Sequence, residues 1–160
     1  MADTGPIIAF ARVGRLALLQ QVVEKLAVPE AVYEDLVIKG QGRPGAAEVE
    51  RATWIERRAI SDPTMVENLP RDLHRGEREA IGLAQELRAQ VLIDEKRGRR
   101  TAAQRGLQVL GSLGILAEAK RRGLIDRINP IVGEMLAVGY WIDEELLPAF
   151  LREIGEAPTQ

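Results

Sequence analysis

A short apolar run that ends directly in two acids restricts the fold of this chain more than any other feature. Val91-Leu92-Ile93 is followed at once by Asp94 and Glu95. A short run without alternating polar positions is typical of a strand buried on both faces of a parallel sheet. Acids at the end of such a strand face the crevice in which open α/β sheets bind their ligands. The sequence therefore predicts an α/β fold with a polar site at this edge.

Short apolar strands alternate with helices along most of the chain. Strands are expected at residues 25–28, 53–57, 91–93 and 107–110, and helices at 7–13, 16–23, 29–38, 46–52, 75–88, 97–105 and 113–121. This alternation predicts a three-layer α/β/α sandwich with a mainly parallel central sheet. Two more helices, near 131–137 and 144–154, predict a C-terminal helical appendage. We expect residues 1–125 to form the main domain and 126–160 to be its helical extension.

Composition excludes several classes of site. The chain has 160 residues, 46% of them hydrophobic, which suits one domain with a real core. The absence of cysteine excludes disulfides, zinc-thiolate sites and cysteine nucleophiles, and the single histidine, His74, excludes a multi-histidine metal site. With 22 basic and 24 acidic residues the net charge is -2, so any contact with RNA requires a local basic patch.

The sequence also bears on where the protein is found. Its first residues include no basic region of the kind that opens a signal peptide. No apolar run approaches the roughly 18 residues that a membrane span needs. We therefore expect a cytoplasmic protein with no membrane contact.

Four acids could gather at the predicted edge of the sheet. Asp3 precedes Thr4 near the start of the chain, Asp94 ends the apolar run, and Asp35 and Glu77 fall on predicted helices. Each acid also has an ordinary structural interpretation. Asp3 or Thr4 could cap the first helix, and Glu77 could complement the positive end of its own helix. Asp94 and Glu95 could cap the helix that starts near Lys96, and Asp35 could pair with Lys39.

Five segments, in this order, resemble the PIN-domain superfamily. Within it the chain is most similar to the PIN-like branch of VapC-type toxins and nucleic acid-binding proteins. The matching segments are Asp3-Thr4-Gly5-Pro6, Pro29 to Leu36, Gly76 to Ile81, Leu92-Ile93-Asp94-Glu95 and Gly111 to Leu116. Each segment alone is a weak signal, whereas the ordered set is specific.

The resemblance implies a metal-dependent ribonuclease, an Mg²⁺- or Mn²⁺-dependent endoribonuclease that can be the toxin of a toxin-antitoxin pair. It implies catalytic roles for Asp3, Asp35, Glu77 and Asp94, with Asp3, Glu77 and Asp94 as metal ligands. Thr4, Glu34, Glu95 and Ser112 would be secondary site residues, and Glu34 competes with Asp35 for the second acidic position. Hard divalent ions suit this oxygen-rich set, and they stabilise charge on both the attacking and the leaving oxygens of a phosphodiester.

A basic run follows the acidic strand end. Arg97, Arg99 and Arg100 are either a solvated helix face or contacts for RNA phosphates. The resemblance implies RNA and a small antitoxin protein as partners. We also expect a second copy of the chain as a partner, because the C-terminal helices carry many apolar residues. The alternative is that the chain is a catalytically inactive PIN-like module with a nucleic-acid-binding or a regulatory role.

Overall fold

The computed structural model describes residues 1–143 and 145–156. Its four strands are β1 (Leu26–Val28), β2 (Ile55–Arg57), β3 (Val91–Leu92) and β4 (Val109–Leu110). The helices of the first half are α1 (Thr4–Arg12), α2 (Leu16–Val23), α3 (Glu30–Tyr33), the π-helix η1 (Glu34–Ile38), α4 (Ala46–Arg51) and α5 (Thr64–Glu67). Those of the second half are α6 (Arg75–Leu87), α7 (Lys96–Gln104), α8 (Ser112–Arg121), α9 (Asn129–Ala137) and α10 (Leu146–Glu153).

The N-terminal residues join two pairs of parallel strands. β1 pairs with β2 and β3 pairs with β4, both in parallel. Between the two pairs, the Ala2 amide donates to the Ala27 carbonyl at 3.2 Å, and the Leu92 amide donates to the Met1 carbonyl at 2.7 Å. Ala2 also forms a parallel bridge with Leu92. The first residues therefore occupy the central position, with β1 on one side and β3 on the other.

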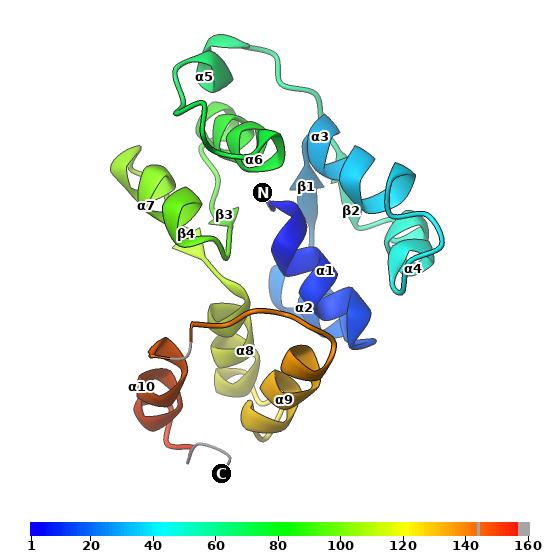
Figure 1. Cartoon of the computed structure of the whole chain (residues 1–160), viewed down its shortest axis with the longest axis vertical. Coiled ribbons are helices and arrows are strands. Elements are labelled where there is room, and N and C mark those ends of the chain that lie inside the picture. The colour runs from blue at the N-terminus through cyan, green and yellow to red at the C-terminus, as the bar shows by residue number, and fades with distance from the viewer. Residues whose placement is uncertain (144, 157–160) are drawn as a thin grey trace.

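Alternating side chains of this sheet enter two separate cores. Leu92 belongs to the larger core, with residues of α1, α2, α8 and α9, whereas Val91 and Ile93 belong to a second core with α6 and α7. Successive residues of a strand point to opposite faces. Both faces of the sheet are thus covered by helices, which confirms the predicted α/β sandwich. Figure 1 shows the short strands at the centre, with α6 and α7 on one side and α1, α8 and α9 on the other.

The structure differs from the sequence prediction in several boundaries. The helix expected over 29–38 is divided into α3 and the π-helix η1, in which the Lys39 amide donates to the Glu34 carbonyl at 2.8 Å. The short helix α5 follows Asp62 and Pro63, in a segment where no helix was expected. The strands β2 and β4 begin two residues later than predicted, at Ile55 and Val109, where their pairing with β1 and β3 starts.

The end of the described chain is fastened to α8 and α9. The buried Glu156 carboxylate accepts hydrogen bonds from the backbone amides of Ile128 and Asn129, at 2.7 and 2.8 Å. The Lys120 ammonium donates to the same carboxylate at 2.8 Å. These hydrogen bonds lower the pKa of Glu156, although its burial acts in the opposite direction. Across 1–143 and 145–156, no helix combines the length and the apolar character that crossing a membrane requires.

Candidate active site

Neighbouring strand ends bring two of the predicted acids to one edge of the sheet. Asp3 follows the central segment, and its amide donates to the Leu92 carbonyl at 2.9 Å. Asp94 lies two residues after Leu92, just beyond the end of the adjacent strand β3. Because these strands are parallel, their carboxyl ends meet at the same edge. The third acid, Glu77, comes from the first turn of α6, which packs over this part of the sheet.

Three glycines leave the space into which these carboxylates fit. A Cβ atom on Gly76 would lie 3.1 Å from Asp3 Oδ1, and one on Gly98 would lie 2.5 Å from Glu77 Oε1. A Cβ on Gly111 would lie 3.0 Å from Asp94 Oδ1. Each glycine belongs to a different segment, so α6, α7 and the end of β4 together enclose the acids. Alanine at any of these positions would crowd a carboxylate.

Burial gives Asp3 and Glu77 unusual electrostatics. Asp3 is 9% exposed and Glu77 4% exposed. Burial raises the pKa of Asp3 to about 7, a hydrogen bond from the Thr4 backbone opposes this shift, and the charges of Glu77, Asp94 and Asp35 add to it. Burial also raises the pKa of Glu77, while its hydrogen bond with His74 acts in the opposite direction. Charged carboxylates in such a place are unfavourable unless a cation compensates them.

Glu77 has one oxygen in a structural bond and one without a partner. Its Oε2 accepts a hydrogen bond from the His74 backbone amide at 3.0 Å, so it does complement the start of α6. Its Oε1 is buried and has no hydrogen-bond partner. Thr4 Oγ1, near Gly76 at the same site, is also buried without a partner. Buried polar atoms of this kind require an explanation, such as a water or an ion.

Asp94 is held by the start of α8. Its Oδ1 accepts a hydrogen bond from the Ser112 amide and its Oδ2 one from the Ser112 hydroxyl, both at 2.7 Å. The expected alternative, that Asp94 caps the helix beginning at Lys96, is wrong, because Asp94 instead caps α8. Glu95 occupies the N-cap position of α7 without a side-chain capping bond and is exposed. Asp3 likewise occupies the N-cap position of α1 without such a bond.

The two acids that compete for the second acidic position each form an ion pair with a basic side chain. Asp35 accepts a hydrogen bond from the Lys39 ammonium at 2.7 Å, the i,i+4 pair expected of an exposed acid. Glu34 pairs with Arg75 at 3.1 Å. Both acids lie in the π-helix η1. Asp35 is near enough to Asp3 for its charge to raise the pKa of Asp3.

The three arginines of the basic run have different surroundings. Arg97 forms an ion pair with Asp72 and is exposed, and Arg100 is also exposed. Arg99 is partly buried and donates a hydrogen bond to the Ile93 carbonyl at 3.1 Å. The basic run therefore divides into two exposed side chains and one that turns toward the acids.

Tyr140 lies at the candidate site, although no motif in the sequence predicted it there. It follows α9 in the chain, and its partly buried side chain lies beside Asp94 and Ser112. Burial raises the pKa of the Tyr140 hydroxyl, and the charge of Asp94 adds to this shift. Residues this far apart in sequence show no spacing that would predict their contact.

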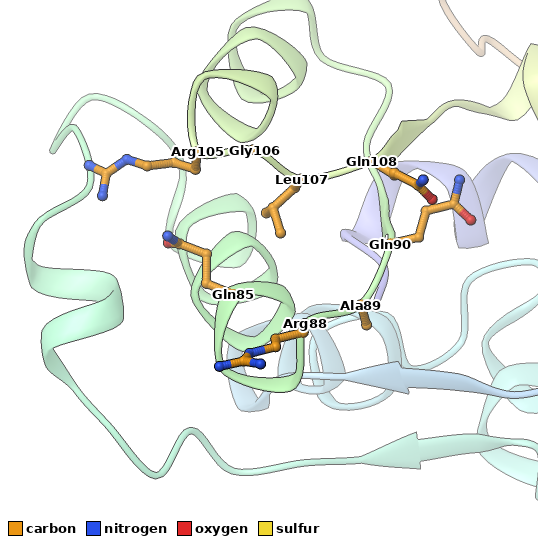
Figure 2. A pocket seen from close by; sticks show the side chains of 8 residues that line it. All are labelled: Gln85, Arg88, Ala89, Gln90, Arg105, Gly106, Leu107 and Gln108. Carbon is orange, nitrogen blue, oxygen red and sulfur yellow. The ribbon is translucent and has the colours of Figure 1, made fainter.

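Two cavities in the described part of the chain lie away from the acids. One, of about 320 Å³, is lined by Gln85, Arg88, Ala89, Gln90, Arg105, Gly106, Leu107 and Gln108. Figure 2 shows it between α6 and the segment that joins α7 to β4. The other, of about 580 Å³, lies between α8 and the sheet and includes Met1 and Leu92 in its lining. Neither is lined by Asp3, Glu77 or Asp94.

The acids supply the donors of a hard divalent ion but do not form a closed cage. Within residues 1–143 and 145–156, no three acid or histidine side chains are grouped closely enough to hold one ion directly. Mg²⁺ usually keeps several waters and binds through one or two carboxylates, so a closed protein cage is not needed. The unpartnered Glu77 Oε1 and the buried Asp3 carboxylate fit such a partly hydrated cation.

The fold and site define an α/β protein with buried acids at the carboxyl edge of a parallel sheet. A family model described as PIN domain matches residues 1–156, so the chain belongs to the PIN-domain family. No curated protein and no solved structure matches the chain. PIN domains are generally nucleases that use divalent metal ions.

Proposed function

We propose that this protein is an Mg²⁺- or Mn²⁺-dependent endoribonuclease that hydrolyses RNA phosphodiester bonds. The observation that carries the proposal is the burial of Asp3 and Glu77 beside Asp94 at the carboxyl edge of the sheet. Like charges gathered in a desolvated place are costly, and a divalent cation would remove that cost. Membership of the PIN-domain family supports the same chemistry.

In this proposal Asp3, Glu77 and Asp94 hold the metal ion, with Asp35 at the outer side of the site. A bound divalent ion stabilises charge on the phosphate and activates the attacking water. Other residues of the chain hold these carboxylates in position. Ser112 orients Asp94 through two hydrogen bonds, and the His74 amide orients Glu77. Thr4 and Glu95 are secondary residues, and Arg97, Arg99 and Arg100 bind RNA phosphates.

Asp94→Asn tests the proposal directly. The neutral amide is a poor metal ligand, so we expect RNA cleavage in Mg²⁺ or Mn²⁺ to fall by at least about 100-fold. The amide keeps the shape of the carboxylate, and loss of one clustered charge relieves repulsion, so the unfolding midpoint should be unchanged or slightly higher. The measurement is cleavage of a labelled RNA with each metal and with EDTA, beside thermal unfolding. Full activity of Asp94→Asn in Mn²⁺ would exclude Asp94 as a metal ligand.

The second candidate function is that of a catalytically inactive PIN-like module with a nucleic-acid-binding or a regulatory role. The observation in its favour is that, in the described chain, no three acids are close enough to bind one ion together. The two candidates differ in the cleavage assay. A wild-type protein that binds RNA but cleaves none in either metal is the module and not the enzyme.

We also propose that the enzyme acts in the cytoplasm as the toxin of a toxin-antitoxin pair, restrained by a small antitoxin protein. The proposal rests on the resemblance to VapC-type sequences. Expression of the wild-type chain alone should then stop bacterial growth, whereas Asp94→Asn should be tolerated. A small neighbouring gene whose co-expression restores growth would identify the antitoxin, and unimpaired growth with active wild-type protein would exclude the toxin role.

A further inference from the structure

Arg99 is set apart from the other arginines of α7 by the direction of its side chain. Its Nη1 donates a hydrogen bond of 3.1 Å to the carbonyl of Ile93, the residue directly before Asp94. Arg97 pairs with Asp72 on the surface, and Arg100 is exposed. The Arg99 guanidinium is therefore turned back onto the carboxyl end of β3, where the acids gather.

Gly111 provides the space for this guanidinium. Its backbone has φ -114° and ψ 178°, an extended conformation that any residue adopts, so glycine is not needed for the backbone. A Cβ at this position would lie 2.5 Å from Arg99 Nη1 and 3.0 Å from Asp94 Oδ1. The missing side chain therefore lets a cation and a carboxylate lie against the same residue.

The surroundings of the guanidinium leave it able to bind an anion. Asp94 receives its two short hydrogen bonds from Ser112. Among the described residues, the hydrogen bond to Ile93 is the one that the Arg99 side chain makes. A guanidinium binds phosphate through paired N–H groups in a fixed plane. Acids alone would repel an approaching phosphate, and Arg99 is the basic side chain of α7 that lies beside them.

We propose that Arg99 binds the phosphate at which the acidic site acts, and that Gly111 positions its guanidinium there. This inference rests on the proposed ribonuclease function and adds a division of roles to it. Arg97 and Arg100 contact flanking phosphates, whose loss weakens RNA binding. Arg99 contacts the reacting phosphate, where charge develops in the transition state, so its loss lowers the rate of the chemical step.

The test compares Arg99→Ala, Gly111→Ala and the double variant in single-turnover cleavage of a labelled RNA oligonucleotide, with Mn²⁺ and saturating protein. We expect each single change to lower the rate by about 100-fold, the usual effect of losing one donor to a developing charge. If Gly111→Ala acts by displacing the guanidinium, the double variant should be no slower than Arg99→Ala alone. Arg99→Lys should recover part of the rate, because it keeps the charge without the planar fork.

Gly114→Ala is the matched control for the added methyl group. Its Cβ would approach Leu110 Cδ1 at 2.5 Å, the same distance as at Gly111, but against an apolar side chain away from the acids. We expect Gly114→Ala to cleave at the wild-type rate. Thermal shifts with Mn²⁺ should be alike in wild type, Arg99→Ala and Gly111→Ala, which would show that Asp94 still binds the ion.

The inference would be overturned by wild-type cleavage by Arg99→Ala, by additive losses in the double variant, or by loss of the Mn²⁺ shift in Gly111→Ala. Fluorescence anisotropy with the same RNA in Ca²⁺ separates this inference from the proposed function. If wild type binds RNA without cleaving it, the ribonuclease proposal fails. In that case Arg99→Ala and Gly111→Ala should weaken RNA binding equally. The salt dependence of binding should fall by the amount expected for about one lost phosphate contact. An unchanged RNA affinity would overturn the role of Arg99.

Discussion

At the scale of single residues, Asp3 should make the metal-free protein less stable as the pH rises. Its pKa is raised from 3.8 to about 7 by burial first, with added repulsion from Glu77, Asp94 and Asp35. Between these two pH values the folded state holds a proton that the unfolded state has lost, so unfolding releases one proton from Asp3 and refolding takes it up again. The free energy of unfolding should therefore fall across this window, by at most about 1.4 kcal/mol per pH unit.

Asp3→Asn should remove most of this fall, because the amide does not titrate. Urea unfolding at pH 4.5 to 8 in EDTA measures the effect, with the exposed Asp126→Asn as control. Mg²⁺ should restore stability to the wild-type protein above pH 7, since it binds the ionised carboxylate. If the free energy of unfolding falls equally with pH in wild type and Asp3→Asn, Asp3 has its ordinary pKa in the folded protein.

The sequence could indicate which acids meet at one edge of the sheet but not what surrounds them. Asp3 and Asp94 were predictable, because each follows an apolar segment and parallel strands end at one edge. The packing of Gly98 against Glu77 and of Gly111 against Asp94 depends on how α7 and β4 approach α6 and β3. Such distances are set by tertiary packing, and no local spacing encodes them. The position of Tyr140 beside Asp94 could not be predicted for the same reason.

At the scale of elements, the type of structure was easier to predict than its local geometry. The strand at Val91 and the helix from Arg75 to Leu87 follow directly from their apolar patterns. The π-helix η1 could not be predicted, because its apolar positions fit an α-helix about as well. The hydrogen bond from the Lys39 amide to the Glu34 carbonyl, five residues earlier, is of the kind that distinguishes a π-helix from an α-helix.

Gly40 should be essential to the end of this π-helix. A Cβ at Gly40 would lie 2.2 Å from the Leu36 carbonyl oxygen, a backbone atom that cannot move aside without changing η1. Gly40→Ala should therefore lower the free energy of unfolding by about 1–3 kcal/mol, as overpacking does. It should also shift Asp35, which lies in the same element. Urea unfolding measures the stability.

Gly133→Ala is the matched control for Gly40→Ala. Gly133 lies within α9, and a Cβ there would meet no atom within 4 Å. Alanine is a better helix former than glycine, so this change should stabilise the protein by about 0.5–1 kcal/mol. A Gly40→Ala protein as stable as wild type would show that η1 relaxes at no cost.

At the scale of the whole molecule, Glu156 should stabilise the packing of the C-terminal segment against α8 and α9. Its carboxylate satisfies two backbone amides at the start of α9 and pairs with Lys120 of α8. Glu156→Ala would leave buried donors unpaired, which costs about 1–3 kcal/mol for such groups. The unfolding midpoint in urea should fall accordingly, whereas the exposed Glu153→Ala should leave it within about 0.5 kcal/mol of wild type. Equal midpoints for the two variants would contradict this role.

The C-terminal helices should also join two copies of the chain. Ile131, Met135 and Leu151 are buried within one chain, so they cannot take part. Trp141 and Leu146 remain 72% and 56% exposed, which is unusual for side chains of this size. Exposed apolar side chains near one end of a molecule favour an interface with another protein surface. We expect a homodimer by light scattering at micromolar concentration.

A double change of Trp141 and Leu146 to serine should convert this dimer to a monomer without unfolding it, because both side chains are exposed in the single chain. Leu87→Ser, at an exposed position of α6 that is 43% accessible, should leave the dimer intact. RNA cleavage by the monomeric variant then has a clear meaning, since Asp3, Glu77 and Asp94 all belong to one chain. Retained cleavage would place the complete site in each subunit, and a monomeric wild-type mass would exclude the dimer.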